Sequence, residues 1–154
     1  MTNLQQLFHD LIRWETELWN DVDARLRADL ELPLSRFEPM QVIARLGSCR
    51  VQDIARELSI TVGGVSKLVD RIESAGLCQR GVNPDDARSS IITLTSRGRR
   101  VLSRATAVFQ KELETQVGLA LSDTDLEQFA RTLIRLREHR ADLNSATLES
   151  GRTT

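Results

Sequence analysis

The stretch QDIARELSITVGGVSKLVDRIESAGLCQRGVNPD, residues 52–85, decides the fold of this chain. Apolar residues recur at helical spacing on both sides of a short break, first as Val51, Ile54, Ala55 and Leu58 and then as Val65, Leu68, Val69, Ile72 and Ala75. The break, Ser59-Ile60-Thr61, has room only for a tight turn, and the Thr61 hydroxyl can cap the second helix. The pattern therefore predicts two short helices that cross at a steep angle.

A β-hairpin is predicted directly after the second helix. Gly76 ends that helix, and Leu77 begins an extended run. The partner strand is expected at residues 90–94, which are rich in Ile and Thr, and residues 83–86 (NPDD) have strong turn-forming composition. This unbroken order is more restrictive than any single element. It predicts a helix-turn-helix with a wing, which can place a helix in a major groove and the hairpin in an adjacent minor groove.

Three motifs in and after this stretch carry a resemblance to a known family. LVDRIESAGLCQR (68–80) is similar to the end of the recognition helix in the MarR family of bacterial winged-helix regulators, DAR (86–88) to its wing motif, and LTSRG (94–98) to the exit from its wing. The resemblance covers roughly residues 4–143. It implies a mainly α fold with a small β-hairpin, in which N- and C-terminal dimerisation helices flank a winged helix-turn-helix reading head.

Composition limits the classes of function. The chain has 154 residues, a single-domain length, and 40% of them are hydrophobic. It has no run of 18 apolar residues, and its start, MTNLQQLFHDLIRWE, lacks the pattern of a secretion signal, so we expect a cytoplasmic protein. No Gly-rich phosphate loop, nucleophile setting or metal-ligand spacing is present, so we expect neither an enzyme nor a cofactor.

Charge is unevenly distributed along the chain although the formal net charge is only −1. Residues 35–104 hold 12 Lys or Arg against 7 Asp or Glu, a net of +5. Residues 1–34 hold 3 against 7 (−4), and residues 105–154 hold 6 against 8 (−2). A basic middle between acidic ends predicts that the middle meets phosphate, whereas ordinary scatter is the alternative.

The flanking segments predict long helices within one domain that spans residues 1–154. The first helix runs to about Leu30, and a capping box of Ser35 and Glu38 opens a second helix. After the wing, Thr95 caps a helix that ends near Leu121. The proposed parts are dimerisation helices at 1–34 and 105–145, a winged helix-turn-helix at 35–104 and a frayed tail at 146–154.

The first and last helices are apolar over more surface than the reading head can cover. We therefore infer a homodimer whose helices form an interchain bundle. A symmetric dimer would set its recognition helices about 34 Å apart and would bind a palindromic site. The alternative is a monomer that folds these helices onto itself.

The predicted DNA contacts lie on the outward face of the second helix and on the wing. Hydroxyls and backbone N–H groups at a helix N-terminus bind phosphate, and Lys67 or Arg71 can reach phosphate or a guanine edge. The resemblance assigns Arg88 to the minor groove, with Asp86 orienting its guanidinium or bracing the wing. The alternatives are a loosened helix start at Gly63-Gly64 and an exposed salt bridge between Asp86 and Arg88. The DNA-binding set is Thr61, Gly63, Gly64, Ser66, Lys67, Arg71, Asp86 and Arg88, and weaker candidates, more often plain surface charges, are Arg36, Arg80, Arg97 and Arg99.

Other ligands are less strongly indicated. The resemblance implies a small aromatic or phenolic effector between the dimer helices and the head, with His9, Trp14, Trp19 and Met40 as lining candidates, although a Trp on an amphipathic helix is more often part of the core. Cys49 and Cys78 are interpreted as structural, but Arg50 could lower the pKa of Cys49, which leaves a thiol switch open. With two distant His residues, no metal site is predicted.

Together these observations predict a DNA-binding transcriptional regulator, a repressor, that binds a palindromic operator as a homodimer and responds to a small-molecule effector. Two alternatives remain at this point. One is a thiol-switched regulator. The other is a helical protein-interaction module with a winged-helix shape, which would not need Lys67, Arg71 and Arg88 together.

Overall fold

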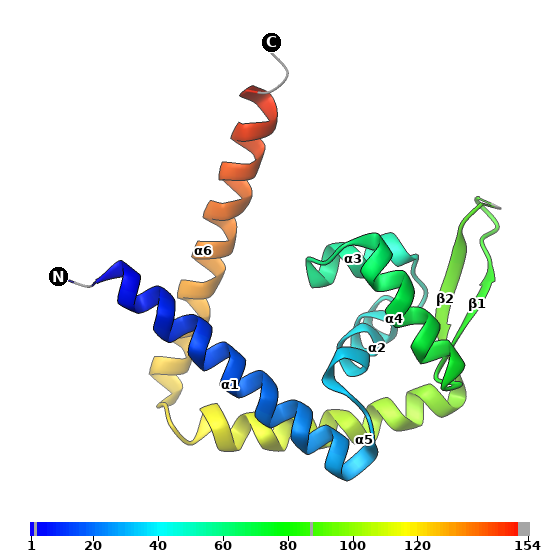
Figure 1. Ribbon diagram of the computed structural model, residues 1–154, viewed down its shortest axis with the longest axis horizontal. Coiled ribbons are helices and arrows are strands. Elements are labelled where there is room, and N and C mark those ends of the chain that lie inside the picture. Colours follow the sequence, from blue (N-terminus) through cyan, green and yellow to red (C-terminus); the bar gives the residue numbers. More distant parts are fainter. Residues whose placement is uncertain (2, 87, 151–154) are drawn as a thin grey trace. The chain divides into compact units, whose positions relative to one another are not determined.

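The computed structural model describes residues 1, 3–86 and 88–150, and the side chains up to residue 145 (Figure 1). The elements in chain order are α1 (Leu4–Leu30), α2 (Leu34–Leu46), α3 (Val51–Leu58), α4 (Val62–Ser74), β1 (Cys78–Val82), β2 (Ser90–Leu94), α5 (Ser96–Leu113), the π-helical turn η1 (Glu114–Gly118) and α6 (Asp123–Ser150). The mainly helical class with a small hairpin is confirmed. The chain divides into two compact units, residues 1–112 and 113–154, each described by itself below.

Helix α2 is the centre of the first unit. It contacts α1, α3, α4 and β2, and its Phe37, Met40 and Ile43 side chains are completely buried. The Phe37 ring packs against Phe109 of α5, with 4.9 Å between ring centroids. Further core residues from the other elements are Ile54, Val65, Val69, Ile72 and Ile92. The reading head is therefore built around one hydrophobic core.

The junction between α1 and α2 corrects the predicted capping box. Helix α2 begins at Leu34, so Ser35 lies inside it, and no side chain of Pro33 caps it. The carboxylate of Asp23 on α1 takes this role, because its Oδ1 accepts a hydrogen bond from the Leu34 N–H at 2.7 Å. Glu38 is half-buried, and burial raises its pKa. A carboxylate 11 residues away has thus replaced the local cap that the sequence suggested.

The predicted helix-turn-helix is confirmed. Ser59 ends α3 in the left-handed region with φ 55°, and the Thr61 hydroxyl accepts a hydrogen bond from the Gly64 N–H at 3.1 Å. At the other end of α4, Gly76 adopts φ +71°, where a side chain is strained. The turn and both ends of α4 therefore follow from the residues that predicted them.

The predicted hairpin is confirmed and gains a short third member. Strands β1 and β2 pair antiparallel in a register from Cys78↔Leu94 to Val82↔Ser90. Cys49 bridges to Ile92 on the other side of β2, through N···O distances of 3.2 and 2.7 Å. This bridge joins the segment before α3 to the wing, and no periodic pattern in the sequence predicted it.

The start of α5 is fixed against the segment that enters the hairpin. The Thr95 hydroxyl accepts from the Gly98 N–H at 2.9 Å, as predicted for a cap, and donates to the Gly76 carbonyl at 2.7 Å. A Cβ on Gly98 would lie 1.8 Å from the carbonyl oxygen of Leu77. Only glycine permits this backbone approach.

The second unit holds η1 and α6. The predicted break at residues 122–125 is confirmed, since the Ser122 hydroxyl accepts from the Asp125 N–H at 3.2 Å where α6 begins. Helix α6 continues to Ser150, past the predicted start of a frayed tail, and residues 151–154 of that tail lie outside the described residues. Among the helices of the described ranges, none is long and apolar enough to cross a membrane.

Candidate nucleic-acid interface

The outward face of α4 carries most of the predicted DNA contacts. Gly63, Lys67 and Arg71 are exposed, and Ser66 is half-buried. The opposite face supplies the buried Val65, Val69 and Ile72. Because α4 lies beside the hairpin in the same unit (Figure 1), its polar face and the wing belong to one reading head. The amphipathic pattern thus separates a core side from a side available to a ligand.

The two glycines at the start of α4 have different surroundings, and these explain their presence in different ways. A Cβ on Gly64 would lie 3.1 Å from the Thr61 hydroxyl oxygen that caps the helix, so a side chain there would crowd the cap. A Cβ on Gly63 would meet no atom within 4 Å. Packing therefore accounts for Gly64, whereas Gly63 leaves open space outside a helix terminus, where a phosphate or base edge can approach the backbone.

Two apolar residues beside this terminus were missed in the sequence. Ile60 and Val62 are 43% and 51% exposed. They flank Thr61, and exposed apolar side chains can contact thymine methyl groups when a helix terminus enters a major groove. The available signal was that both fall outside the apolar spacing of α3 and α4.

The wing places Arg88 in solvent. The Asp86 carboxylate accepts a hydrogen bond from the backbone N–H of Arg88 at 3.0 Å, and the Asp86 carbonyl accepts from the Ser89 N–H at 3.0 Å. Among the described residues, no ion pair joins Asp86 to the Arg88 guanidinium. Asp86 thus braces the wing backbone and leaves the guanidinium available. Ala87, the middle residue of the motif, lies outside the described residues.

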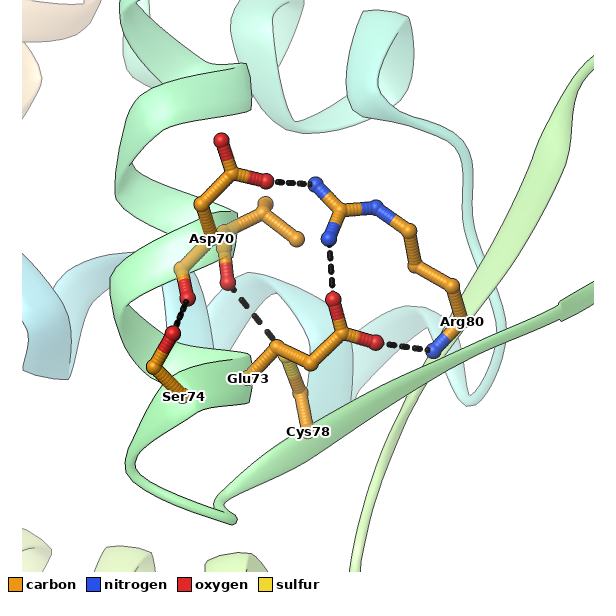
Figure 2. Close-up of polar contacts among 6 residues, drawn as sticks. Asp70, Glu73, Ser74, Cys78 and Arg80 are labelled. Carbon is orange, nitrogen blue, oxygen red and sulfur yellow. Dashed lines mark hydrogen bonds and ion pairs between the residues drawn. The ribbon is translucent and has the colours of Figure 1, made fainter.

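The base of the wing is joined to α4 by a polar cluster centred on Arg80 (Figure 2). Its guanidinium lies 2.6 Å from Asp70 Oδ1 and pairs with Glu73, and Glu73 Oε1 accepts from the Arg80 backbone N–H at 3.0 Å. Partial burial alone would lower the pKa of Arg80, but hydrogen bonds to Asp70 and Glu73 raise it above its usual value. Arg80 is therefore not the plain surface charge that the sequence suggested.

Both thiols are buried and unactivated. Burial raises the pKa of Cys49 to about 11, with Asp53 adding to the effect, and burial likewise raises the pKa of Cys78 to about 11. The suggestion that Arg50 lowers the pKa of Cys49 is wrong, because loss of hydration outweighs any attraction of the thiolate to the guanidinium. These thiols suit packing rather than redox sensing.

The four effector candidates differ in how accessible they are. Met40 is completely buried in the core of the head, so it does not line an accessible crevice. His9, Trp14 and Trp19 lie on α1, with the two Trp side chains 39% and 37% exposed. A hollow of about 330 Å³ is lined by Trp19 with Glu15 and Thr16. Across the described ranges, no three His, Cys, Asp or Glu side chains gather as metal ligands would.

Comparison with known proteins finds relatives of the segment that carries these residues. A sequence model of the MarR family matches residues 32–90. The HTH-type transcriptional repressor Rv2887 of Mycobacterium tuberculosis is 28% identical over 116 residues, which cover 75% of this chain and 82% of the relative. The uncharacterized HTH-type transcriptional regulator YfiV of Bacillus subtilis is 25% identical over 81 residues, 53% of this chain, and the match spans 49% of its length.

Solved structures agree on the fold. Sco3205, a MarR family transcriptional regulator from Streptomyces coelicolor solved in complex with DNA, superposes with a TM-score of 0.82 at 23% identity, covering 88% of this chain and 86% of that one. The matched segment of the family model contains α2, α3, α4 and β1, the elements that form the outward face and the base of the wing. Residues 32–90 of the chain therefore match the MarR family, and the chain has the fold of solved MarR family winged helix-turn-helix regulators.

Proposed function

We propose that the chain is a repressor that acts in the cytoplasm and binds a palindromic operator as a homodimer, with α4 in the major groove and the wing in the minor groove. One observation carries the proposal. The open N-terminus of α4 at Gly63, the exposed Lys67 and the exposed Arg88 lie in one compact unit. These are the groups that bind phosphate, base edges and a narrow minor groove.

The dimer is supported by apolar side chains that α1 leaves in solvent. Its first half exposes Leu4, Leu7, Phe8, Leu11 and Ile12 by between 41% and 76%. A contiguous apolar face of this kind marks a surface that another protein surface covers. In a symmetric dimer, two reading heads about 34 Å apart would match successive major grooves.

Regulation by a small aromatic effector is the remaining part of the proposal. Trp14 and Trp19 on α1 are partly exposed, and they lie on the helix that the dimer would use. A ligand bound beside them would change operator affinity only if it bound one spacing of the two heads more tightly than another. The repressor role follows the name of the relative Rv2887.

The test is a mobility-shift titration on DNA from the region upstream of the protein's own gene, with unrelated DNA of the same length as the control. We expect a specific shift whose affinity falls steeply with salt, because phosphate contacts release counterions. A complex whose size corresponds to two chains per site would support the dimer. Equal, weak binding to both DNAs would instead favour the protein-interaction module.

A further inference from the structure

Asp70 carries a carboxylate on the face of α4 that the proposed function turns toward DNA. Residues 63, 67, 70 and 74 share one side of a helix, so Asp70 follows Gly63 and Lys67 along the outward face. Its side chain is 61% exposed. B-DNA carries one negative charge per about 1.7 Å of axis, so an uncompensated carboxylate here would oppose binding.

Arg80 lies where it can cancel that charge. Alternation along β1 puts Arg80 on the same side as Cys78, whose thiol contacts the Val69 carbonyl of α4 at 3.8 Å. The strand register pairs Arg80 with Ile92, which is completely buried, so the backbone at Arg80 belongs to the fixed base of the wing. The guanidinium therefore reaches α4 from a strand that is paired with β2 at this position.

Glu73 holds Arg80 in this position from two points. Its carboxylate accepts from the Arg80 backbone N–H and pairs with one arm of the guanidinium, while the other arm lies 2.6 Å from Asp70 (Figure 2). Only 25% of the Arg80 side chain is exposed, against 61% for Asp70. A planar guanidinium presents a separate N–H donor to each carboxylate in a fixed fork, which the compact ammonium of Lys does not reproduce.

We propose that Arg80 is a positioning residue that masks the Asp70 carboxylate on the DNA-facing side of α4 without itself contacting phosphate. The inference rests on the proposed function and adds an electrostatic requirement to it. Without the Arg80 side chain, the outward face would present Asp70 unpaired, while Glu73 would keep its hydrogen bond from the backbone N–H at position 80. With it, the positive charge of Lys67 acts on DNA without a bare carboxylate one turn further along α4.

The test is a double-mutant cycle of Arg80→Gln and Asp70→Asn, measured as affinity for a random-sequence duplex of about 30 base pairs, long enough for two half-sites. We expect Arg80→Gln to bind about tenfold more weakly and both Asp70→Asn and the double variant to remain within about threefold of wild type. Arg104→Gln, which removes the same charge from an exposed side chain of α5, is the control and is expected to stay near wild type.

Two further readouts separate masking from other roles. Arg80→Gln and the double variant both lack the ion pair, so they should melt at similar temperatures although only the first loses affinity for DNA. The slope of log affinity against log salt should be unchanged in Arg80→Gln, whereas loss of a phosphate contact would reduce it by about 1. A reduced slope, or a double variant as weak as Arg80→Gln, would overturn the proposal.

A second substitution covers the case in which Arg80→Gln does not fold. Arg80→Lys keeps the charge but loses the fork that pairs with both carboxylates, so it should bind DNA more weakly than wild type and recover on addition of Asp70→Asn. Equal weakness with and without Asp70→Asn would contradict masking. Wild-type protein that binds neither this duplex nor the upstream DNA would remove the proposed function itself, whereas normal binding by Arg80→Gln would remove only the role of Arg80.

Discussion

The reading head buries most of its large apolar residues, whereas the first half of α1 leaves its own exposed to solvent. In the head, α2, α3 and α4 bury Phe37, Ile43, Ile54 and Ile72 completely. In α1, only Val22 and Leu26 are buried, and both lie toward its C-terminal end. The head therefore completes a core from its own residues, while the N-terminal part of α1 requires a second surface.

This difference separates two kinds of stability. Substitutions in the head should lower the free energy of unfolding of the single chain. Substitutions on the exposed face of α1 should weaken association and leave the fold of the head intact. The second unit, taken by itself, also exposes apolar side chains. On α6, the exposed fractions lie between 39% and 57% for Leu133, Ile134, Leu136 and Leu143.

The largest effect on stability is expected at Gly98, where the head has no space for a side chain. Gly98→Ala would place a Cβ 1.8 Å from the Leu77 carbonyl oxygen, a backbone atom that cannot move without shifting α5 or the wing. We expect the free energy of unfolding to fall by about 3 kcal/mol or more. Urea unfolding followed by circular dichroism measures this loss.

Gly63→Ala is the matched control, because its Cβ would meet nothing within 4 Å. Exchanging glycine for alanine within a helix should leave stability unchanged or raise it by up to about 1 kcal/mol. If both variants lost the same stability, the close approach of α5 to Leu77 would not be a determinant of the fold.

A second prediction addresses the other side of the comparison. Leu7→Glu combined with Phe8→Glu puts two charges on the exposed apolar face of α1, which would be buried in the proposed dimer. We expect a dimer at least about 100-fold weaker, with the melting of the dissociated head unchanged. Sedimentation velocity across a range of protein concentrations measures the change, and Gln6→Glu on the opposite face of α1 is the control. A double variant that stays dimeric would show that this face is not the interface.

The contrast between regions also explains what could be predicted from the sequence. Features that depend on neighbours in the chain were found, including the Thr61 cap, the Gly76 stop and the Thr95 cap. Features that depend on distant partners were not. The Asp23 cap on α2 and the Cys49 bridge to Ile92 join segments 11 and more than 40 residues apart, and no spacing rule encodes them.

The candidate site follows the same rule. The outward face of α4 was predicted from helical periodicity, because burial of one face determines exposure of the other. Arg80 was interpreted as a surface charge, since its partners Asp70 and Glu73 meet it only after β1 folds back along α4. Their roles toward DNA, like those of Lys67 and Arg88, remain predictions.

A third prediction tests whether DNA binding belongs to the head alone. Arg88 is exposed on the wing, and its removal should weaken operator binding by about 1–3 kcal/mol without changing the melting temperature or the dimer. Mobility-shift titration of Arg88→Ala measures the change. Arg135→Ala, an equal loss of charge on α6, should bind as wild type does. Equal affinity of Arg88→Ala and wild type would exclude the minor-groove role.

The smallest effect is expected at Asp23, a residue of α1 that caps the start of α2. Its carboxylate accepts from the Leu34 N–H and pairs with Arg27 at 2.6 Å; burial alone would raise its pKa, but these two partners outweigh burial and lower it. A group whose pKa is lowered by folding stabilises the fold above its ordinary pKa, and this stabilisation is lost as pH falls through the folded pKa. Asp23→Ala should therefore lower the free energy of unfolding by about 1 kcal/mol at neutral pH and by much less in acid, as measured by urea unfolding at both pH values.

Asp21→Ala, which removes an exposed carboxylate from the same helix, should show no such pH-dependent difference from wild type. A constant deficit for Asp23→Ala at every pH would mean that the aspartate acts through packing rather than through its charge.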